Sequence, residues 1–328
     1  MAEEIDAVIM WVDGEDPIFR RQYENYAGIE KKSRLNHEGK GRHRNTGELI
    51  YCLRGIRKNA PWIRKIHIVT SGQIPNFVDF NVPGVELVIH SDIFPDLAYL
   101  PTFNSFAIDS CLHRIPGLTK KFVRFSDDFI VLNPVTPEDL IGPDGQGVYY
   151  LGPNVPDLSK NEVPTSNYLE TLAYNRALLA TRGVIAAHAP QHVPQIRDID
   201  VCMQIEREFS DEIRMTREAK FRQKDNINML FLYPHFVAGN KKLEINSKGW
   251  HVEPGSFVYY TWSRVRQALV GHPTKDWREN IRQAVADNVL FLNINDHFGE
   301  NPNEVDVLDY SRLMSEVLAA PASFEVSK

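Results

Sequence analysis

The stretch FVRFSDDFIVLNP, residues 122–134, places two adjacent aspartates, Asp127 and Asp128, between two apolar runs. Both runs have the composition of strands that are covered on both faces. Burying a carboxylate pair costs several kcal/mol unless the pair is hydrogen-bonded, protonated or bound to a cation. The pair therefore either closes a solvated turn or lies at the mouth of a site.

Further apolar runs precede this stretch and alternate with helical segments. Strands are predicted at residues 5–12, 65–72, 85–90 and 121–126. Asn45 and Glu48 have the spacing of a capping box before a helical stripe that ends near Asn59. A second helix is predicted from Thr102 to Pro116. Strands that alternate with helices indicate βαβ units and a mostly parallel α/β sheet.

Polar side chains follow the predicted strands at the points where the strands end. They are Asp13 and Asp16, Ser71 and Gly72, Asp92, the pair Asp127 and Asp128, and Asn295 and Asp296 after a strand at 288–296. Ligands of such sheets bind beyond the carboxyl ends of the strands. This convergence favours a site over a solvated turn. A divalent cation that bridges nucleotide phosphates suits such carboxylates, with Asp296 as a second ligand.

The second half of the chain has a less regular pattern. Residues 142–166 are rich in Gly and Pro and predict a long connection or an inserted lobe. Helices are predicted at 167–185, 197–209, within 220–236, at 276–288 and at 304–319, with a short strand in GSFVYYTW. We interpret residues 1–328 as a single α/β domain made of a first half (1–141), a connection or lobe (142–187) and a second half (188–328).

Composition narrows the class of protein. A formal net charge of −6 argues against a general nucleic-acid-binding surface. Cys52, Cys111 and Cys202 lie among apolar residues, which favours buried thiols over disulfides or a zinc site. No apolar run approaches the ~18 residues that span a bilayer, and the N-terminus lacks a basic leader. The sequence predicts a cytoplasmic protein, and peripheral attachment to the inner face of the membrane is compatible with it.

Two motifs in the first half each have two readings. The segment WVDGEDP is typical of a tight Asp-Gly turn, and it also suits a nucleobase platform at Trp11 with a ribose contact at Asp13. The basic segment 31–45 is either a solvated loop or a loop that closes over a diphosphate, with Arg44 nearest the site.

Two further motifs lie in the second half. His188 and His192 are four residues apart, but Pro190 and Pro194 make a metal-binding helix improbable, so the histidines are expected to be structural hydrogen-bonding groups. Arg222 either clamps a phosphate or belongs to a surface capping cluster.

These segments together resemble the Stealth family. The first two blocks of that family are similar to IDAVIMWVDGEDP (5–17), GELIYCLRGIRKNAPWIRKIHIVTSGQIP (47–75) and the segment from HSDIF to NPV (90–135). The third block is similar to HAPQHVPQIRDI (188–199) and FRQKDNIN (221–228), and the fourth to FLNINDHF (291–298) and LAAPASFE (318–325).

The family contains bacterial capsular polysaccharide phosphotransferases and the α/β subunit of lysosomal-enzyme N-acetylglucosamine-1-phosphotransferase. The resemblance implies transfer of a hexose 1-phosphate, such as N-acetylhexosamine 1-phosphate, from a UDP-sugar to a hydroxyl of an acceptor glycan, with release of UMP. It also implies a Rossmann-like, GT-A-like nucleotide-sugar-transferase fold. The chain lacks the large inserted modules of the animal relatives, which favours a compact bacterial glycan-modifying enzyme.

By similarity, the functional acidic pair, histidine and arginine of the family correspond to Asp127, Asp128, His188 and Arg222. On this hypothesis Asp128 and Asp296 hold Mg²⁺ or Mn²⁺, and Arg222 with Arg44 neutralises the attacked phosphoryl group. His188 is the first choice of base and Asp127 the second.

The nucleotide-sugar contacts that we expect are Trp11, Asp13, Gly14, Arg44, Ser71, Gly72 and Asn104. Two rival functions are a conventional glycosyltransferase that releases UDP and a non-catalytic nucleotide-sugar-binding protein. The sequence indicates neither the hexose and acceptor nor the oligomeric state.

Overall fold

A five-stranded sheet forms the centre of the molecule. The computed structural model describes residues 3–29, 45–142, 145, 147–239, 244–246, 249–251, 258–259, 264–270, 276–296 and 304–326. The strand order is β3 (Val85–Ile89), β2 (Ile63–Thr70), β1 (Ile5–Met10), β4 (Lys121–Ser126) and β8 (Gln195–Asp198). The first four strands are parallel and β8 is antiparallel to β4. The predicted mostly parallel α/β sheet is thus confirmed.

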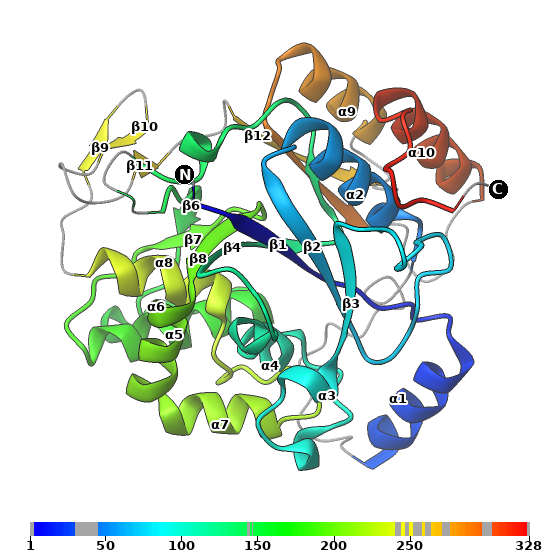
Figure 1. Ribbon diagram of the computed structural model, residues 1–328. Coiled ribbons are helices and arrows are strands. Elements are labelled where there is room, and N and C mark those ends of the chain that lie inside the picture. The colour runs from blue at the N-terminus through cyan, green and yellow to red at the C-terminus, as the bar shows by residue number, and fades with distance from the viewer. Residues whose placement is uncertain are drawn as a thin grey trace.

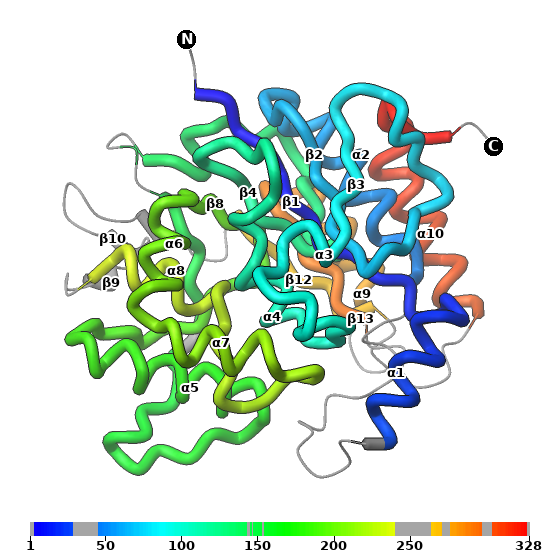
Figure 2. Tube along the Cα trace, turned by 60° about the horizontal axis from the view of Figure 1, so that its bottom comes forward, coloured from blue at the N-terminus to red at the C-terminus, as the bar shows by residue number. Residues whose placement is uncertain are grey.

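Helices cover the sheet on both sides, which explains the apolar composition of its strands. Helices α2 (Glu48–Asn59), α9 (Trp277–Ala286) and α10 (Glu304–Val317) lie together on one side (Figures 1 and 2). Helices α5 (Asn167–Ala180), α6 (Ile199–Glu208), α7 (Ser210–Glu218) and α8 (Met229–Ala238) gather beyond the β4–β8 side. Val8 and Ile9 of β1 consequently have no exposed surface.

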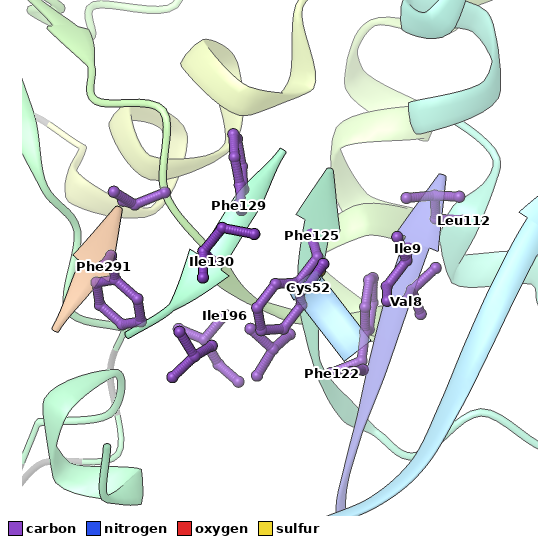
Figure 3. Packing of buried hydrophobic residues seen from close by; sticks show 14 of the residues in the cluster. Val8, Ile9, Cys52, Leu112, Phe122, Phe125, Phe129, Ile130, Ile196 and Phe291 are labelled. Carbon is purple, nitrogen blue, oxygen red and sulfur yellow. The ribbon is translucent and has the colours of Figure 1, made fainter. Parts of the chain in front are cut away.

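A second sheet of three strands continues from the first. It consists of β12 (Val265–Val270), β13 (Phe291–Asp296) and β5 (Phe129–Val131). Only Asp127 and Asp128 separate β5 from β4, so the acidic pair is the junction between the two sheets. Figure 3 shows Phe125 of β4, Phe129 and Ile130 of β5 and Phe291 of β13 among the buried side chains around this junction.

The strand that ends at Asp296 was expected in the same sheet as β1 and β4, and this expectation is wrong. Strand β13 pairs with β12 in parallel and with β5 in an antiparallel sense. Because β13 and β5 run in opposite directions, the carboxyl end of β13 approaches the start of β5. Asn293 and the end of β13 therefore approach the acidic pair from the second sheet and not from the central sheet.

Several element boundaries differ from the sequence-based expectation. Helix α2 begins after Gly47 at φ +91°, and Glu48 binds the backbone N–H of Thr46, while Asn45 accepts from the N–H of Gly47. The prediction of a capping box between Asn45 and Glu48 is therefore wrong. The helix predicted at 102–116 is interrupted into α4 (Ser105–Asp109) and a 3₁₀ turn, Leu112–Arg114. Helices α1 (Pro17–Ile29) and α7 were not anticipated.

The other elements are short. They are α3 (His90–Ile93), β6 (Leu151–Asn154), β7 (His188–Pro190), β9 (Glu244–Asn246), β10 (Gly249–His251), β11 (Val258–Tyr259) and the 3₁₀ turns Leu97–Tyr99, Pro137–Asp139 and Leu158–Lys160. Strand β6 pairs with β7, and β9 to β11 form a separate antiparallel sheet. Strand β6 and the turn at 158–160 lie in the segment 142–166, which was predicted as a connection or lobe.

Candidate active site

The acidic pair lies in the turn between β4 and β5, where the two sheets meet. The backbone carbonyl of Asp128 accepts a hydrogen bond from the N–H of Ile294 at 3.0 Å. Its side-chain Oδ2 accepts another from Nδ2 of Asn293, also at 3.0 Å. Strand β13 thus holds Asp128 through both its main chain and its side chain, which limits the freedom of the turn.

Burial and neighbouring negative charge make ionisation of the pair costly. Burial, followed by the charges of Asp128 and Glu48, raises the pKa of Asp127 well above its usual value. Burial raises the pKa of Asp128 to about 6, against the opposing effects of the Asn293 hydrogen bond and the Arg124 charge. Such a pair is stabilised by a nearby positive charge, whether from a side chain or a cation.

Glu48, at the start of α2, is a third carboxylate of this site, and sequence reasoning assigned it only a capping role. It is 8% exposed and binds the hydroxyl of Thr46. Burial raises the pKa of Glu48, and the charge of Asp296 adds to the rise. Glu48 therefore links the electrostatics of Asp127 and Asp128 to that of Asp296. The sequence signal was present, since Glu48 follows the basic segment at the start of a buried helix.

The donor chemistry of these carboxylates suits a hard divalent cation such as Mg²⁺ or Mn²⁺. In the described parts of the chain, no group of three or more His, Cys, Asp and Glu side chains is arranged to hold a metal ion. Mg²⁺ is commonly bound by one or two carboxylates together with substrate phosphates and water. A crowded carboxylate pair without a complete protein cage fits that mode.

The loops after β1 and β2 are tied together by Gln73. Its Nε2 donates to the carbonyl of Asp13 at 2.7 Å, and its Oε1 accepts from the N–H of Asp13 at 3.0 Å. Gly72 at φ +109° provides the turn that directs Gln73 across. The structure thus brings the predicted Trp11, Asp13, Gly14, Ser71 and Gly72 to adjacent strand ends.

Two other predicted nucleotide contacts are not placed at this edge. The amide of Asn104 has no exposed surface; it donates to Asn226 Oδ1 at 2.8 Å and accepts from the N–H of Phe106. Asn104 caps α4 and joins it to the segment 216–226, so its side-chain amide is engaged within the protein. Arg44 lies outside the described residues.

Arg222 lies against α4. Its Nη2 donates to the hydroxyl of Ser105, and its Cζ lies 4.5 Å from the centroid of the Phe106 ring. Its charge also contributes to lowering the pKa of Asp109, at the end of the same helix. Asp109 was not selected from the sequence, because a lone Asp within an amphipathic segment carries no distinctive pattern.

The structure separates the two histidines of the HAPQHVP motif. The His192 ring lies 6.0 Å from Phe129 and 6.2 Å from Tyr168. Burial, and then the charges of Arg124 and Arg222, lower the pKa of His192 to about 4. Burial also lowers the pKa of His188, but its charged neighbour is Arg176 and its carbonyl binds His235. His192 therefore packs on Phe129, the residue that follows the acidic pair, and is under the charge of Arg222, whereas the charged group that acts on His188 is Arg176.

The fold and the site define an α/β protein with a crowded carboxylate pair at the carboxyl edge of a mostly parallel sheet, with the charge of Arg124 acting on the pair. Residues 42–148 match Stealth protein CR2, conserved region 2, and residues 191–239 match Stealth protein CR3, conserved region 3. The chain belongs to the Stealth proteins.

Curated relatives carry related names. The exopolysaccharide phosphotransferase SCO6023 of Streptomyces coelicolor is 36% identical over 239 residues, which are 71% of this chain and 40% of that protein. The receptor polysaccharide phosphotransferase WefC of Streptococcus oralis is 39% identical over 155 residues, 47% of this chain and 46% of that protein. This chain thus spans less than half of the length of either relative.

Among solved structures, the galactosyltransferase LgtC aligns over 99% of this chain and 98% of its own, with 11% identity and a TM-score of 0.45. In the described parts of this chain, no helix is long and apolar enough to cross a membrane.

All three cysteines are buried and free, as predicted.

Proposed function

We propose that this protein transfers a hexose 1-phosphate from a UDP-sugar to a hydroxyl of an acceptor glycan and releases UMP. The observation that carries the proposal is the buried acidic pair Asp127–Asp128, followed by Phe129 on which His192 packs under the charge of Arg222, in a Stealth chain whose relatives are named polysaccharide phosphotransferases. Phosphoryl transfer depends mainly on positioning and charge neutralisation, and these residues supply both.

In the proposed reaction, the acceptor oxygen forms a bond to the sugar-bearing phosphorus while the bond from that phosphorus to the bridging oxygen of UMP breaks. His192 accepts the hydroxyl proton, because its low pKa of about 4 keeps the imidazole neutral near pH 7. Arg222 neutralises charge on the phosphoryl oxygens. Asp127 positions the acceptor hydroxyl and is the second candidate for the base.

The loop residues Trp11, Asp13, Gly14, Ser71 and Gly72 are the proposed nucleoside side of the site, since they lie at adjacent strand ends. Asp128 and Asp296 would hold Mg²⁺ or Mn²⁺. A bound ion would neutralise the diphosphate and stabilise the departing UMP. The free thiols support an assignment to a reducing compartment, which agrees with a cytoplasmic reaction.

The nucleotide product tests the proposal. The protein is incubated with UDP-N-acetylglucosamine, Mg²⁺ and a candidate glycan, and the released nucleotide is identified by chromatography. We expect UMP in a one-to-one ratio with phosphorylated glycan. Release of UDP would indicate that the protein is a glycosyltransferase and would contradict the proposal. Binding of the donor without turnover across a panel of acceptors would indicate a non-catalytic binding protein.

A further inference from the structure

Arg124 of β4 carries a buried guanidinium group with more donors than acceptors around it. Its side chain is 7% exposed, and among the described residues neither Nε nor Nη1 has a hydrogen-bond acceptor. A guanidinium group has five N–H donors and stays charged in proteins. Buried arginines are normally paired and hydrogen-bonded, because an unsatisfied buried charge is destabilising. Arg124 is therefore short of partners.

The polar groups next to Arg124 are engaged elsewhere. Asp109 Oδ2 lies 3.4 Å from Nε of Arg124, but the two Asp109 oxygens bind Nη1 and Nη2 of Arg197 at 2.5 and 3.3 Å. Gln195 faces Arg124 across the β4–β8 pair, and its Oε1 accepts from Arg197 Nε at 3.0 Å. The Gln195 Nε2 donates to the carbonyl of Leu230. These neighbours satisfy Arg197 and leave Arg124 unsatisfied.

Two buried guanidinium groups compete for the carboxylate of Asp109. Arg197 has no exposed side-chain surface, and Arg124 is nearly as buried. Both guanidinium groups share the single carboxylate of Asp109, and the other negative charges that act on Arg124 are those of Asp127 and Asp128. None of these carboxylates gives Nε or Nη1 of Arg124 a hydrogen-bond acceptor, which a bound oxyanion would supply.

The contacts of Arg124 place its unsatisfied donors next to the candidate active site. Its Cζ lies 5.5 Å from the centroid of Phe129, and the same ring lies 6.0 Å from His192. Figure 3 shows Phe129 in β5, beyond the end of β4. The charge of Arg124 also acts on both Asp128 and His192. Arg124 thus lies among the residues to which the reacting groups are assigned.

We propose that Arg124 binds an oxygen of a phosphoryl group, as a second guanidinium beside Arg222. The planar fork of arginine matches the tetrahedral oxygens of phosphate, and Phe129 and Asp109 hold it in place. This proposal rests on the proposed function in one respect, namely that the bound oxyanion is the phosphoryl group that is transferred. The identity of the site as a phosphate receptor depends on Arg124 and its partners alone.

Binding of inorganic phosphate tests the proposal without turnover. Isothermal titration of phosphate into the protein at pH 7.5 and low ionic strength, with EDTA present, measures affinity in the absence of divalent cations. Arg124→Met should weaken phosphate binding at least tenfold, and Arg124→Lys should fall between Arg124→Met and wild type. Arg214→Met is the matched control, because this arginine is 51% exposed on α7 and its loss removes the same charge.

Circular dichroism and thermal unfolding establish that each variant is folded. If Arg124→Met does not fold, Arg124→Lys decides, since it keeps the charge and loses the fork. Wild-type affinity in either folded variant, or no phosphate binding by the wild-type protein, would overturn the proposal. If the protein releases no UMP but the variants bind phosphate more weakly, the proposed function is wrong and the phosphate site stands. If the protein releases UMP but the variants bind phosphate with wild-type affinity, only the proposed role of Arg124 is wrong.

Discussion

Asn293 donates a hydrogen bond from Nδ2 to Oδ2 of Asp128 at 3.0 Å, although the two residues are 165 positions apart in the chain. The bond joins β13 to the turn that connects the two sheets. It favours the charged form of Asp128 and so opposes the rise in pKa that burial causes. Asn293 is itself buried, so this contact is shielded from water.

Replacing Asn293 by alanine should raise the pKa of Asp128, since the charged carboxylate loses a donor. Activity that requires ionised Asp128 should then fall at a higher pH than in the wild-type protein. A pH profile of kcat/KM measures this shift. Asn133→Ala is the control, because Asn133 donates to the carbonyl of Val289 and no bond joins it to Asp128. An equal shift in both variants would contradict the assignment.

His192→Ala should reduce kcat by roughly 10²- to 10⁴-fold, as expected for loss of a general base. His188→Gln should change kcat by less than about tenfold, because the charged group that acts on His188 is Arg176 of α5, whereas His192 packs on Phe129. Single-turnover rates of the two variants, compared at equal folded fraction, measure the difference. A larger loss in His188→Gln would restore the original choice of base.

Asp128→Asn should abolish divalent-ion stimulation of turnover, since it removes a proposed ion ligand and keeps the shape of the side chain. EDTA should inactivate the wild-type protein, and added Mg²⁺ or Mn²⁺ should restore it. Titration of activity against ion concentration measures both effects. Near-wild-type turnover of Asp128→Asn at saturating Mg²⁺ would exclude Asp128 as a ligand.

Gln73→Glu should raise KM for the nucleotide sugar several-fold and leave kcat nearly unchanged. The change replaces the N–H donor to the Asp13 carbonyl by a carboxylate oxygen, so the loop after β1 keeps one of its two hydrogen bonds to residue 73 and gains a repulsive contact with the carbonyl. Initial-rate kinetics at varied donor concentration separate the two constants. Gln204→Glu is the control for the added charge, because Gln204 is an exposed residue of α6. A fall in kcat alone would argue against a role in donor binding.

Folding stability should decrease as the pH falls below about 6.5, in part because of His90. Burial lowers the pKa of His90 to about 4 in the folded protein, from 6.5 in the unfolded chain. Between these values the unfolded chain binds the proton first, so stability is complete above pH 6.5 and is lost towards pH 4. One such histidine contributes up to roughly 1.4 kcal/mol per pH unit.

Urea unfolding at pH 7.5, 6.5 and 5.5 measures this dependence. His90→Gln should flatten the slope, because glutamine does not titrate, and its free energy of unfolding at pH 7.5 serves as the internal reference. An unchanged slope in His90→Gln would show that the folded protein accommodates the protonated ring.

The central sheet could be predicted because its physical signals are local. Strands β1, β2, β3 and β4 are short runs rich in apolar residues, and the polar residues after each strand mark its carboxyl end. The fifth strand, β8, was not predicted. The helices at 199–208, 277–286 and 304–317 follow from amphipathic spacing, and the helix at 167–180 from helix-forming residues after the capping Ser166. Helix α7 was missed because the preceding α6 ends only one residue earlier and leaves no stop signal.

The sequence by itself determined the α/β class, the acidic pair at a strand end and the family, because each depends on short-range patterns. Only the tertiary structure decided which side chains share the site. The antiparallel pairing of β13 with β5 brought Asn293 to Asp128, and Glu48 entered the cluster from the start of α2. His192 rather than His188 came to lie beside Phe129. These contacts join distant segments through burial and strand pairing, which no local pattern of residues encodes.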